Sequence, residues 1–380
     1  MKKLMTRGAI IAIAIGILFR PVIYPFVISL KASKYDKQLG RIQPKSPSEL
    51  HSIYKDKNVL IIGGTRGVGR GIALTVAKAG ADVTVVGRSE KSGKAILQLM
   101  KQHAQNAGSS DGSNTSADDD KSSKGVKQDF AEALAQQRIL QQQQRMNYVQ
   151  GDIGSVRSAK KCIKSLTDYI KTNQGGEKFD YIFVTAAIFP YWNDLMNEDG
   201  LERSFGIAVI GRYLIYSHLE HLLEPDNGRM LNVIASGMDE YPFDRELASG
   251  SRTDGSLFQF VMNFACGTEM MMIGLSQRNE FYSKVTRVST HPGVLKTDLH
   301  RGQGWIMDLI ESVMVTFIGF TEEEAGVRQA SILSSSQLTN EHLNYVDEFM
   351  KGRLLGSKVP LDEHLDWLMN LIDEKIHQRE

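Results

Sequence analysis

A glycine-rich turn between a short apolar run and a helical pattern constrains this chain more than any other feature. Residues 59–62 are Val-Leu-Ile-Ile, which predicts a buried strand. Three glycines follow it: Gly63, Gly67 and Gly69. Residues 72–77 then open a helix, and a second strand at 82–86 follows at the distance of a βαβ unit. Glycine permits a tight turn and a close backbone approach to a pyrophosphate at the helix N-terminus. The segment therefore predicts a dinucleotide site, and the alternative is a tight turn without a ligand.

Strand and helix patterns continue to alternate along the chain. Strands four, five and six are expected at 179–185, 229–234 and 284–290, and a long helix at 201–223. Thr321 with Glu324 three residues later matches a capped helix start. This alternation predicts an α/β fold, a doubly wound parallel sheet of the Rossmann type in a single domain. Ligands of such sheets bind beyond the carboxyl ends of the strands.

Five landmarks in order resemble the short-chain dehydrogenase/reductase family over roughly residues 50 to 380. The turn resembles the family's T-G-x-x-x-G-x-G, with Ile62 in place of the Thr, and 151–153 resembles the segment with the Asp that contacts adenine. Residues 184–188 resemble the N-N-A-G-I strand end with both Asn replaced. Residues 229–236 resemble the strand that ends at the catalytic Ser, and 291–297 the P-G-x-x-x-T clamp on the nicotinamide amide.

This resemblance implies a set of cofactor-binding residues on the turn, the strand ends and the P-G segment. They are Gly63, Thr65, Arg66, Gly67, Val68, Gly69, Arg88, Ser89, Asp152, Ile153, Ala186, Pro292, Gly293 and Thr297. The second strand ends in Gly87-Arg88-Ser89 without the acid that NAD sites usually place there. Arg88 and Arg66 offer two guanidinium groups to a 2′-phosphate, so the expected cofactor is NADP(H) rather than NAD(H).

The family's catalytic groups are only partly present. The family uses Asn, Ser, Tyr and Lys, and the resemblance retains Ser236 as the catalytic candidate while Ala208 replaces the Asn. No lysine occurs between Lys178 and Lys284, and the helix expected at 256–270 contains no tyrosine. Tyr241 lies only five residues after Ser236, too near for the usual geometry. A proton could instead come from a small set of groups, none of them singled out by the pattern: Thr268, Glu269, His291 or a water chain.

Three functions therefore remain open. The first is an NADP(H)-dependent oxidoreductase acting on a small lipophilic alcohol or carbonyl compound. The second is a catalytically silent pseudoenzyme that binds NADP(H) and acts as a sensor or interaction module. The third is a structural surface without nucleotide, against which the glycine turn and the P-G segment argue. Substrate and oligomeric state are not predicted.

Composition excludes other classes of function. The 380 residues are 42% hydrophobic, which is enough for one large core. The net charge of +1 gives no indication of the strongly basic surface that nucleic-acid binding requires. The two cysteines, Cys162 and Cys266, cannot form a disulfide framework, and no Cys/His cluster has metal-ligand spacing, so no metal site is expected.

The N-terminus predicts a membrane anchor over residues 1–34, in contact with the lipid bilayer through residues 8–30. Lys2, Lys3 and Arg7 precede the apolar stretch, and Arg20 and Pro21 interrupt it. The stretch exceeds the roughly 20 residues needed to span, so it either crosses with a kink or lies as a shallow hairpin. No small-residue cleavage site follows it. We expect an endoplasmic reticulum or other organelle membrane with the domain in the cytosol.

The rest of the chain divides into two parts. Residues 35–57 are expected to be a polar linker, and residues 58–380 the NADP(H)-binding domain. A Ser/Asp/Gly-rich and then Gln-rich stretch at about 101–145 is expected to be a low-complexity insertion in that domain.

Overall fold

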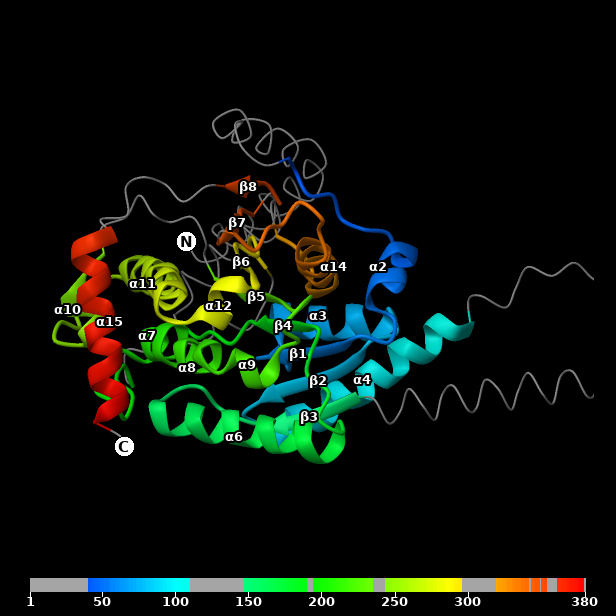
Figure 1. Cartoon of the computed structure of the whole chain (residues 1–380), viewed down its shortest axis with the longest axis horizontal. Coiled ribbons are helices and arrows are strands. Elements are labelled where there is room, and N and C mark those ends of the chain that lie inside the picture. The colour runs from blue at the N-terminus through cyan, green and yellow to red at the C-terminus, as the bar shows by residue number, and fades with distance from the viewer. Residues whose placement is uncertain are drawn as a thin grey trace, which may run out of the picture.

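The computed structural model describes residues 40–109, 146–189, 194–234, 243–295, 319–341, 343–348, 350–353 and 361–378. These residues form an eight-stranded sheet with helices on both faces (Figure 1). The predicted anchor at 8–30 lies outside the described residues, as does 110–145 of the predicted insertion. In the part of the chain that is described, no helix is long and apolar enough to cross a bilayer.

The sheet confirms the predicted Rossmann-type, doubly wound topology. Its strand order is β3-β2-β1-β4-β5-β6-β7-β8, in which the first seven are parallel and β8 is antiparallel to β7. The bounds are β1 Asn58–Ile62, β2 Asp82–Gly87, β3 Met146–Gln150, β4 Tyr181–Val184, β5 Arg229–Val233, β6 Thr286–Thr290, β7 Asn344–Val346 and β8 Gly352–Arg353. The order reverses direction between β1 and β4, so the switch point at which such sheets bind ligands lies beside the glycine turn.

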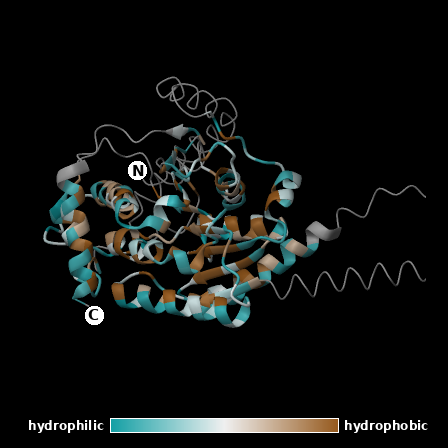
Figure 2. Cartoon of the chain, viewed as in Figure 1, coloured by the Kyte–Doolittle hydropathy of each residue, from teal (hydrophilic) through white to brown (hydrophobic). Residues whose placement is uncertain are grey.

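Helices cover both faces of this sheet. They are α2 Pro47–Tyr54, α3 Gly67–Lys78, α4 Glu90–Ser109, α6 Val156–Asn173, α7 Arg203–Phe205, the π-helix η2 Gly206–Gly211, α8 Arg212–Ser217, α9 Leu219–Leu222, α10 Arg245–Ser249, α11 Leu257–Arg278, α12 Glu280–Lys284, α14 Glu322–Leu333 and α15 Leu361–His377. One apolar core packs α2, α3, α4 and α14 on the sheet, and another packs α6, α8, α11 and α15. The apolar strands lie between these layers, and the helices turn hydrophilic residues outward (Figure 2).

The segment 201–223 is not the single α-helix that the sequence predicts. It contains α7, the π-helix η2, α8 and α9. The backbone is tightly confined here, because a Cβ on Gly211 would lie 2.1 Å from the Ile153 carbonyl oxygen. The Thr268 hydroxyl of α11 lies 3.0 Å from the Ala208 carbonyl oxygen and donates to it. A hydroxyl from another helix thus donates a hydrogen bond to a backbone carbonyl of the π-helix. Helices of this form are rare overall, and those that occur are often found at functional sites.

The folded part also begins before residue 58. Residues 47–54, expected in the linker, form α2, which Ser46 starts with a capping box. Leu50 and Tyr54 are buried, and the Tyr54 hydroxyl donates to the Ala330 carbonyl at 2.8 Å. The predicted start of α14 is confirmed, since Thr321 and Glu324 form a capping box. The sixth strand, predicted from residue 284, begins at Thr286. The short helix α12, which Asn279 caps, extends to Lys284 and so delays the start of the strand.

Helices α3 and α14 cross backbone against backbone. A Cβ on Gly71 would lie 1.8 Å from the Glu322 carbonyl oxygen, and one on Gly326 would lie 2.1 Å from the Gly71 carbonyl oxygen. Only glycine fits at both positions without displacing backbone. This crossing brings the first turn of α14 beside the first turn of α3.

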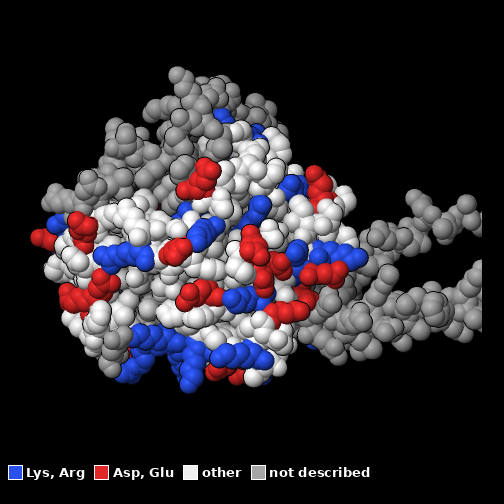
Figure 3. Space-filling model, in the orientation of Figure 1, with Lys and Arg blue, Asp and Glu red and all other residues white. Residues whose placement is uncertain are grey.

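Charged side chains of both signs are mixed over the face seen in Figure 3. Basic side chains gather along its lower edge, where α6 runs. The exposed basic residues of α6 are Arg157, Lys161, Lys164 and Lys171. No single sign of charge covers the whole of this face, which agrees with the net charge of +1.

Candidate functional site

The glycine turn joins β1 to α3 at the carboxyl edge of the sheet. Gly63 and Gly67 adopt φ angles of 93° and 57°, which favour glycine. A Cβ on Gly63 would lie 2.5 Å from the Ala186 amide nitrogen, and one on Gly69 would lie 2.4 Å from the Thr185 hydroxyl oxygen. The turn is therefore packed directly against the end of β4, and the structure brings together four predicted site residues: Gly63, Gly67, Gly69 and Ala186.

The N-terminus of α3 holds a carboxylate from a distant part of the chain. Its N-cap residue, Arg66, makes no side-chain cap. Instead the Gly67 amide donates to Glu322 Oε1 at 2.9 Å, and Arg70 Nε donates to Glu322 Oε2 at 2.5 Å. The Arg70 amide is bonded to the Arg66 carbonyl, so of the first four helix amides those of Val68 and Gly69 are left for a ligand. The helix end therefore already attracts one anion and can accept another.

The turn also lies against the end of β2. The Thr65 methyl carbon lies 2.7 Å from the position that a Cβ on Gly87 would take, which places Thr65 over the last residue of that strand. Arg66 and Arg88 are exposed. No ion pair involves either of them within the described ranges. Ser89 accepts the Ser92 amide at 3.3 Å and so helps to start α4.

Glu90 is the nearest carboxylate after β2, and it is engaged elsewhere. It pairs with Lys94 at 2.8 Å along α4, and the hydrogen bond from Lys94 lowers the pKa of this carboxyl. The carboxylate thus stays ionised and directed at Lys94 across the neutral pH range. The rim formed by Thr65, Arg66 and Arg88 therefore has a basic character.

Asp152 and Ile153 follow the end of β3. Asp152 Oδ1 accepts the Gly154 amide at 3.0 Å, which makes a local turn, and Ile153 is buried against the π-helix. Ile153 belongs to the core, so its contact with a cofactor would be through backbone. Asp152 is partly exposed at the strand end and is the member of this pair that can offer a side chain to a ligand.

Comparison with known proteins agrees with this geometry. The family model described as short chain dehydrogenase matches residues 57–122, which include β1, the glycine turn, α3 and β2. A 3beta-hydroxysteroid dehydrogenase from Mediterraneibacter gnavus is 41% identical over 49 residues, which are 13% of this chain and 18% of that relative.

Over residues 57–122 the chain is thus similar to the short-chain dehydrogenase/reductase family. Solved structures show the same fold over most of the chain. MalC Reductase/Diels-Alderase from Malbranchea aurantiaca is 18% identical, covers 80% of this chain and 98% of its own, and has a TM-score of 0.52. An uncharacterized protein from Mycobacterium paratuberculosis is 14% identical, covers 86% and 97%, and has a TM-score of 0.53. These identities support the fold alone, whereas the sequence match covers the glycine turn.

The P-G segment after β6 lies beside the glycine turn. Gly293 has a φ of 81°, and its amide hydrogen-bonds to His291 Nδ1 at 3.0 Å. Val68 of the turn packs on a small apolar cluster formed by Leu295, Phe320 and Ala325. The structure thus brings Gly293 and the turn to one edge, as the family resemblance implies. Pro292 is partly exposed there, and Thr297 lies outside the described residues.

The catalytic side of the site is less complete. Ser236 and Tyr241 both lie outside the described residues. Helix α11, which follows them in the chain, contains neither tyrosine nor lysine along its whole length. Thr268 on this helix is fully buried, and its hydroxyl contacts the Ala208 and Phe264 carbonyls at 3.0 and 2.7 Å. Its proton is therefore committed to backbone carbonyls rather than available to a substrate.

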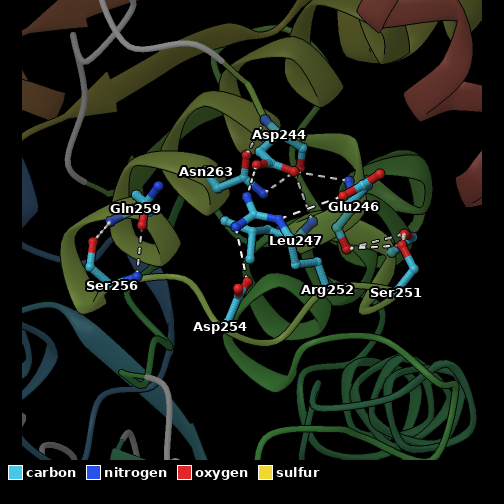
Figure 4. Close-up of polar contacts among 10 residues, drawn as sticks. Asp244, Glu246, Leu247, Ser251, Arg252, Asp254, Ser256, Gln259 and Asn263 are labelled. Carbon is cyan, nitrogen blue, oxygen red and sulfur yellow. Dashed lines mark hydrogen bonds and ion pairs between the residues drawn. The ribbon is translucent and has the colours of Figure 1, made fainter.

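A polar network fixes the start of α11 (Figure 4). Asp244 caps α10 by accepting the Glu246 and Leu247 amides, and Arg252 pairs with Asp244 and Asp254. Asn263 of α11 exchanges hydrogen bonds with the Asp244 backbone at 2.7 and 3.0 Å. Hydrogen bonds to Asp244 and Asp254 raise the pKa of Arg252, so this network keeps its charge at any ordinary pH. The network fixes the start of α11 relative to α10.

Neither cysteine is a candidate nucleophile. Cys162 and Cys266 are both buried and neither forms a disulfide, and burial raises the pKa of the Cys162 thiol to about 12. Within the described residues no group of His, Cys, Asp or Glu could hold a metal ion.

Sequence reasoning missed two residues that shape the site, Glu322 and Arg212. Glu322 is the first residue of a correctly predicted helix, but its contact with Gly67 spans 255 positions. Arg212, whose guanidinium donates to the Ala186 and Val233 carbonyls, lies in the middle of a segment predicted to be an ordinary helix. In neither case does a local pattern signal the contact.

Glu322→Gln tests the role of the carboxylate at α3. Glutamine keeps an acceptor for the Gly67 amide but removes the charge that Arg70 and the helix dipole stabilise. We expect the free energy of unfolding to fall by about 1 kcal/mol. We expect the affinity for NADPH to rise roughly threefold to tenfold, because a like charge next to the pyrophosphate is removed. Denaturant unfolding and calorimetric titration measure the two effects.

Glu323→Gln is the matched control. It removes the same charge one residue later, on an exposed side chain. It should change both quantities little. A Glu322→Gln variant that binds NADPH more weakly than both the wild type and this control would show that the carboxylate supports the nucleotide site instead of opposing it.

Proposed function

We propose that this chain is a membrane-anchored oxidoreductase that binds NADP(H) and acts on a lipophilic alcohol or carbonyl compound. The observation that carries the proposal is the close packing of the glycine turn against the end of β4 and the P-G segment. The Val68 and Gly69 amides at the start of α3 are then left for an anionic ligand. A pyrophosphate is the ligand that this arrangement fits, since backbone amides and the helix dipole both favour an anion.

The preference for NADP(H) over NAD(H) rests on charge. Arg66 and Arg88 are both exposed on the rim that Thr65 forms over β2. The nearest acid, Glu90, is paired with Lys94. A guanidinium matches a 2′-phosphate in charge and in geometry, whereas the ribose hydroxyls of NAD call for a carboxylate acceptor.

The substrate class is inferred from three features. An apolar N-terminal segment that anchors the chain would keep the site close to membrane-dissolved compounds. Helix α11, which follows the Ser236 segment in the chain, exposes a phenylalanine, Phe258, in its first turn. The bacterial relative with a matching segment is named for a hydroxysteroid, which is a lipophilic alcohol. The cofactor supplies the hydride, and the protein positions it.

Calorimetric titration of the full chain with NADPH and NADH tests the cofactor proposal. We expect NADPH to bind more tightly, and Arg88→Ala to weaken NADPH by about tenfold or more while leaving NADH unchanged, because a charge-assisted contact is lost. Arg157→Ala, an exposed arginine on α6, is the control and should alter neither. Equal affinities for the two nucleotides in the wild type and in Arg88→Ala would exclude the proposed preference.

A second candidate function is a catalytically silent NADP(H)-binding module. It is favoured by the absence of tyrosine and lysine from α11 and by the engagement of Thr268 with backbone carbonyls. Loss of a positioned general acid/base lowers a rate by about 10²–10⁴-fold. Both functions share the nucleotide site and differ in turnover.

Steady-state NADPH oxidation by the full chain with steroid ketones, retinal and fatty aldehydes separates the two. We expect turnover well below about 1 s⁻¹, and we expect Ser236→Ala to change it little because its proton-transfer partners are missing. Turnover near that value, abolished by Ser236→Ala, would mean that a complete catalytic set exists and that the silent module is excluded.

A further inference from the structure

A fully buried arginine lies under the ends of β4 and β5. Arg212 opens α8 directly after the π-helix and has no exposed surface. Its Nη2 donates to the Ala186 carbonyl at 2.9 Å and the Val233 carbonyl at 3.0 Å, and its Nη1 donates to Asn232 Oδ1. The guanidinium thus joins two neighbouring strands at the carboxyl edge where the cofactor is proposed to bind.

This positive charge has no negative partner among the described residues. Its acceptors are an amide oxygen and two backbone carbonyls, and its Nε makes no hydrogen bond. The ionisable group that acts on its charge is Tyr216, whose hydroxyl also donates to Asn232 Oδ1, at 2.7 Å. Burial raises the pKa of Tyr216, so the phenol stays neutral.

Arg212 nevertheless keeps its proton. Burial lowers the pKa of Arg212, but a guanidinium titrates so far above neutrality that it remains charged. A buried charge without a counter-ion is costly to a fold. The sites at which such a charge is kept are commonly functional ones.

A single residue connects Arg212 to the glycine turn. The Ala186 amide donates to the Ile62 carbonyl at 3.1 Å, and Gly63 packs on the Ala186 backbone. The Ala186 carbonyl then accepts from Arg212. If NADP(H) binds as proposed, with its 2′-phosphate at the β2 rim and its amide at the P-G segment, the nicotinamide ring would lie toward the ends of β4 and β5, which Arg212 joins.

We infer that Arg212 makes the site prefer the reduced cofactor, NADPH, to the oxidised one, NADP⁺. The oxidised nicotinamide ring carries a positive charge and the reduced ring does not, so the repulsion from Arg212 acts on one form alone. In a poorly solvated site this repulsion is substantial. Arg212 is thus a residue that determines the redox specificity of binding, and this inference rests on the proposed NADP(H) function.

Asn232→Asp tests this, because the two side chains have nearly the same shape. The aspartate would place a carboxylate against the guanidinium and supply the missing counter-charge, and Ser289 could donate to its second oxygen in place of the Asn232 amide contact at 3.5 Å. We expect the wild-type full chain to bind NADPH about tenfold more tightly than NADP⁺. We expect this ratio to fall at least threefold in Asn232→Asp through tighter NADP⁺ binding.

Two further variants complete the experiment. Asn173→Asp adds the same charge at the exposed end of α6 and should keep the wild-type ratio. Arg212→Met removes the buried charge and should lower the ratio as Asn232→Asp does. Asn232→Asp should unfold at a temperature at least as high as the wild type, because the new carboxylate would pair with Arg212. A clearly lower unfolding temperature would contradict the premise that Arg212 lacks a counter-charge.

The outcomes separate this inference from the proposed function. A ratio that is unchanged in both Asn232→Asp and Arg212→Met, with both nucleotides bound, overturns the inference and leaves NADP(H) binding in place. A wild-type chain that binds neither nucleotide overturns both.

Discussion

Helix α3 contacts its neighbours through backbone atoms, and the candidate site depends on these contacts. Gly63 and Gly69 lie against Ala186 and Thr185 at the end of β4, and Gly71 lies against the backbone of α14. Any side chain at these three positions would push the elements apart by an ångström or more. The N-terminus of α3, the switch point of the sheet and the first turn of α14 are therefore held within contact distance of one another.

This packing explains the carboxylate at the helix end. Because Gly71 and Gly326 allow α14 to approach so closely, Glu322 reaches the Gly67 amide and Arg70. The chain thus stabilises the end of α3 with its own anion, whereas the Val68 and Gly69 amides stay available to a phosphate. Under the ends of β4 and β5, in contrast, Arg212 is buried with no carboxylate partner in the part of the chain that the structure describes.

Local patterns predicted the elements that build this site, and they failed where contacts are long-range. The glycine turn, the strands β1, β2, β4, β5 and β6, and the Thr321 capping box follow from residues within one turn or one strand of each other. The π-helix at 206–211 depends instead on Gly211 meeting Ile153 and on Thr268 bonding to Ala208. Strands β7 and β8 are only three and two residues long, so they show no period.

The residues of the candidate site also fall into those that a local pattern predicts and those that depend on long-range contacts. The glycines of the turn were predictable because a tight backbone turn between a strand and a helix requires glycine locally. Glu322 and Arg212 were not, since a charged residue in a helical pattern is ordinarily a solvent-exposed one. Their roles appear only when the sheet brings residues 67, 186, 212 and 322 to one edge.

The central claim is that a nicotinamide dinucleotide binds with its pyrophosphate at the N-terminus of α3. Amide hydrogen exchange of the full chain, measured with and without saturating NADPH, tests it most directly. Exchange at the Val68 and Gly69 amides should slow markedly with NADPH, because a phosphate becomes their hydrogen-bond acceptor. Unchanged exchange at these two amides under saturating NADPH would contradict the account.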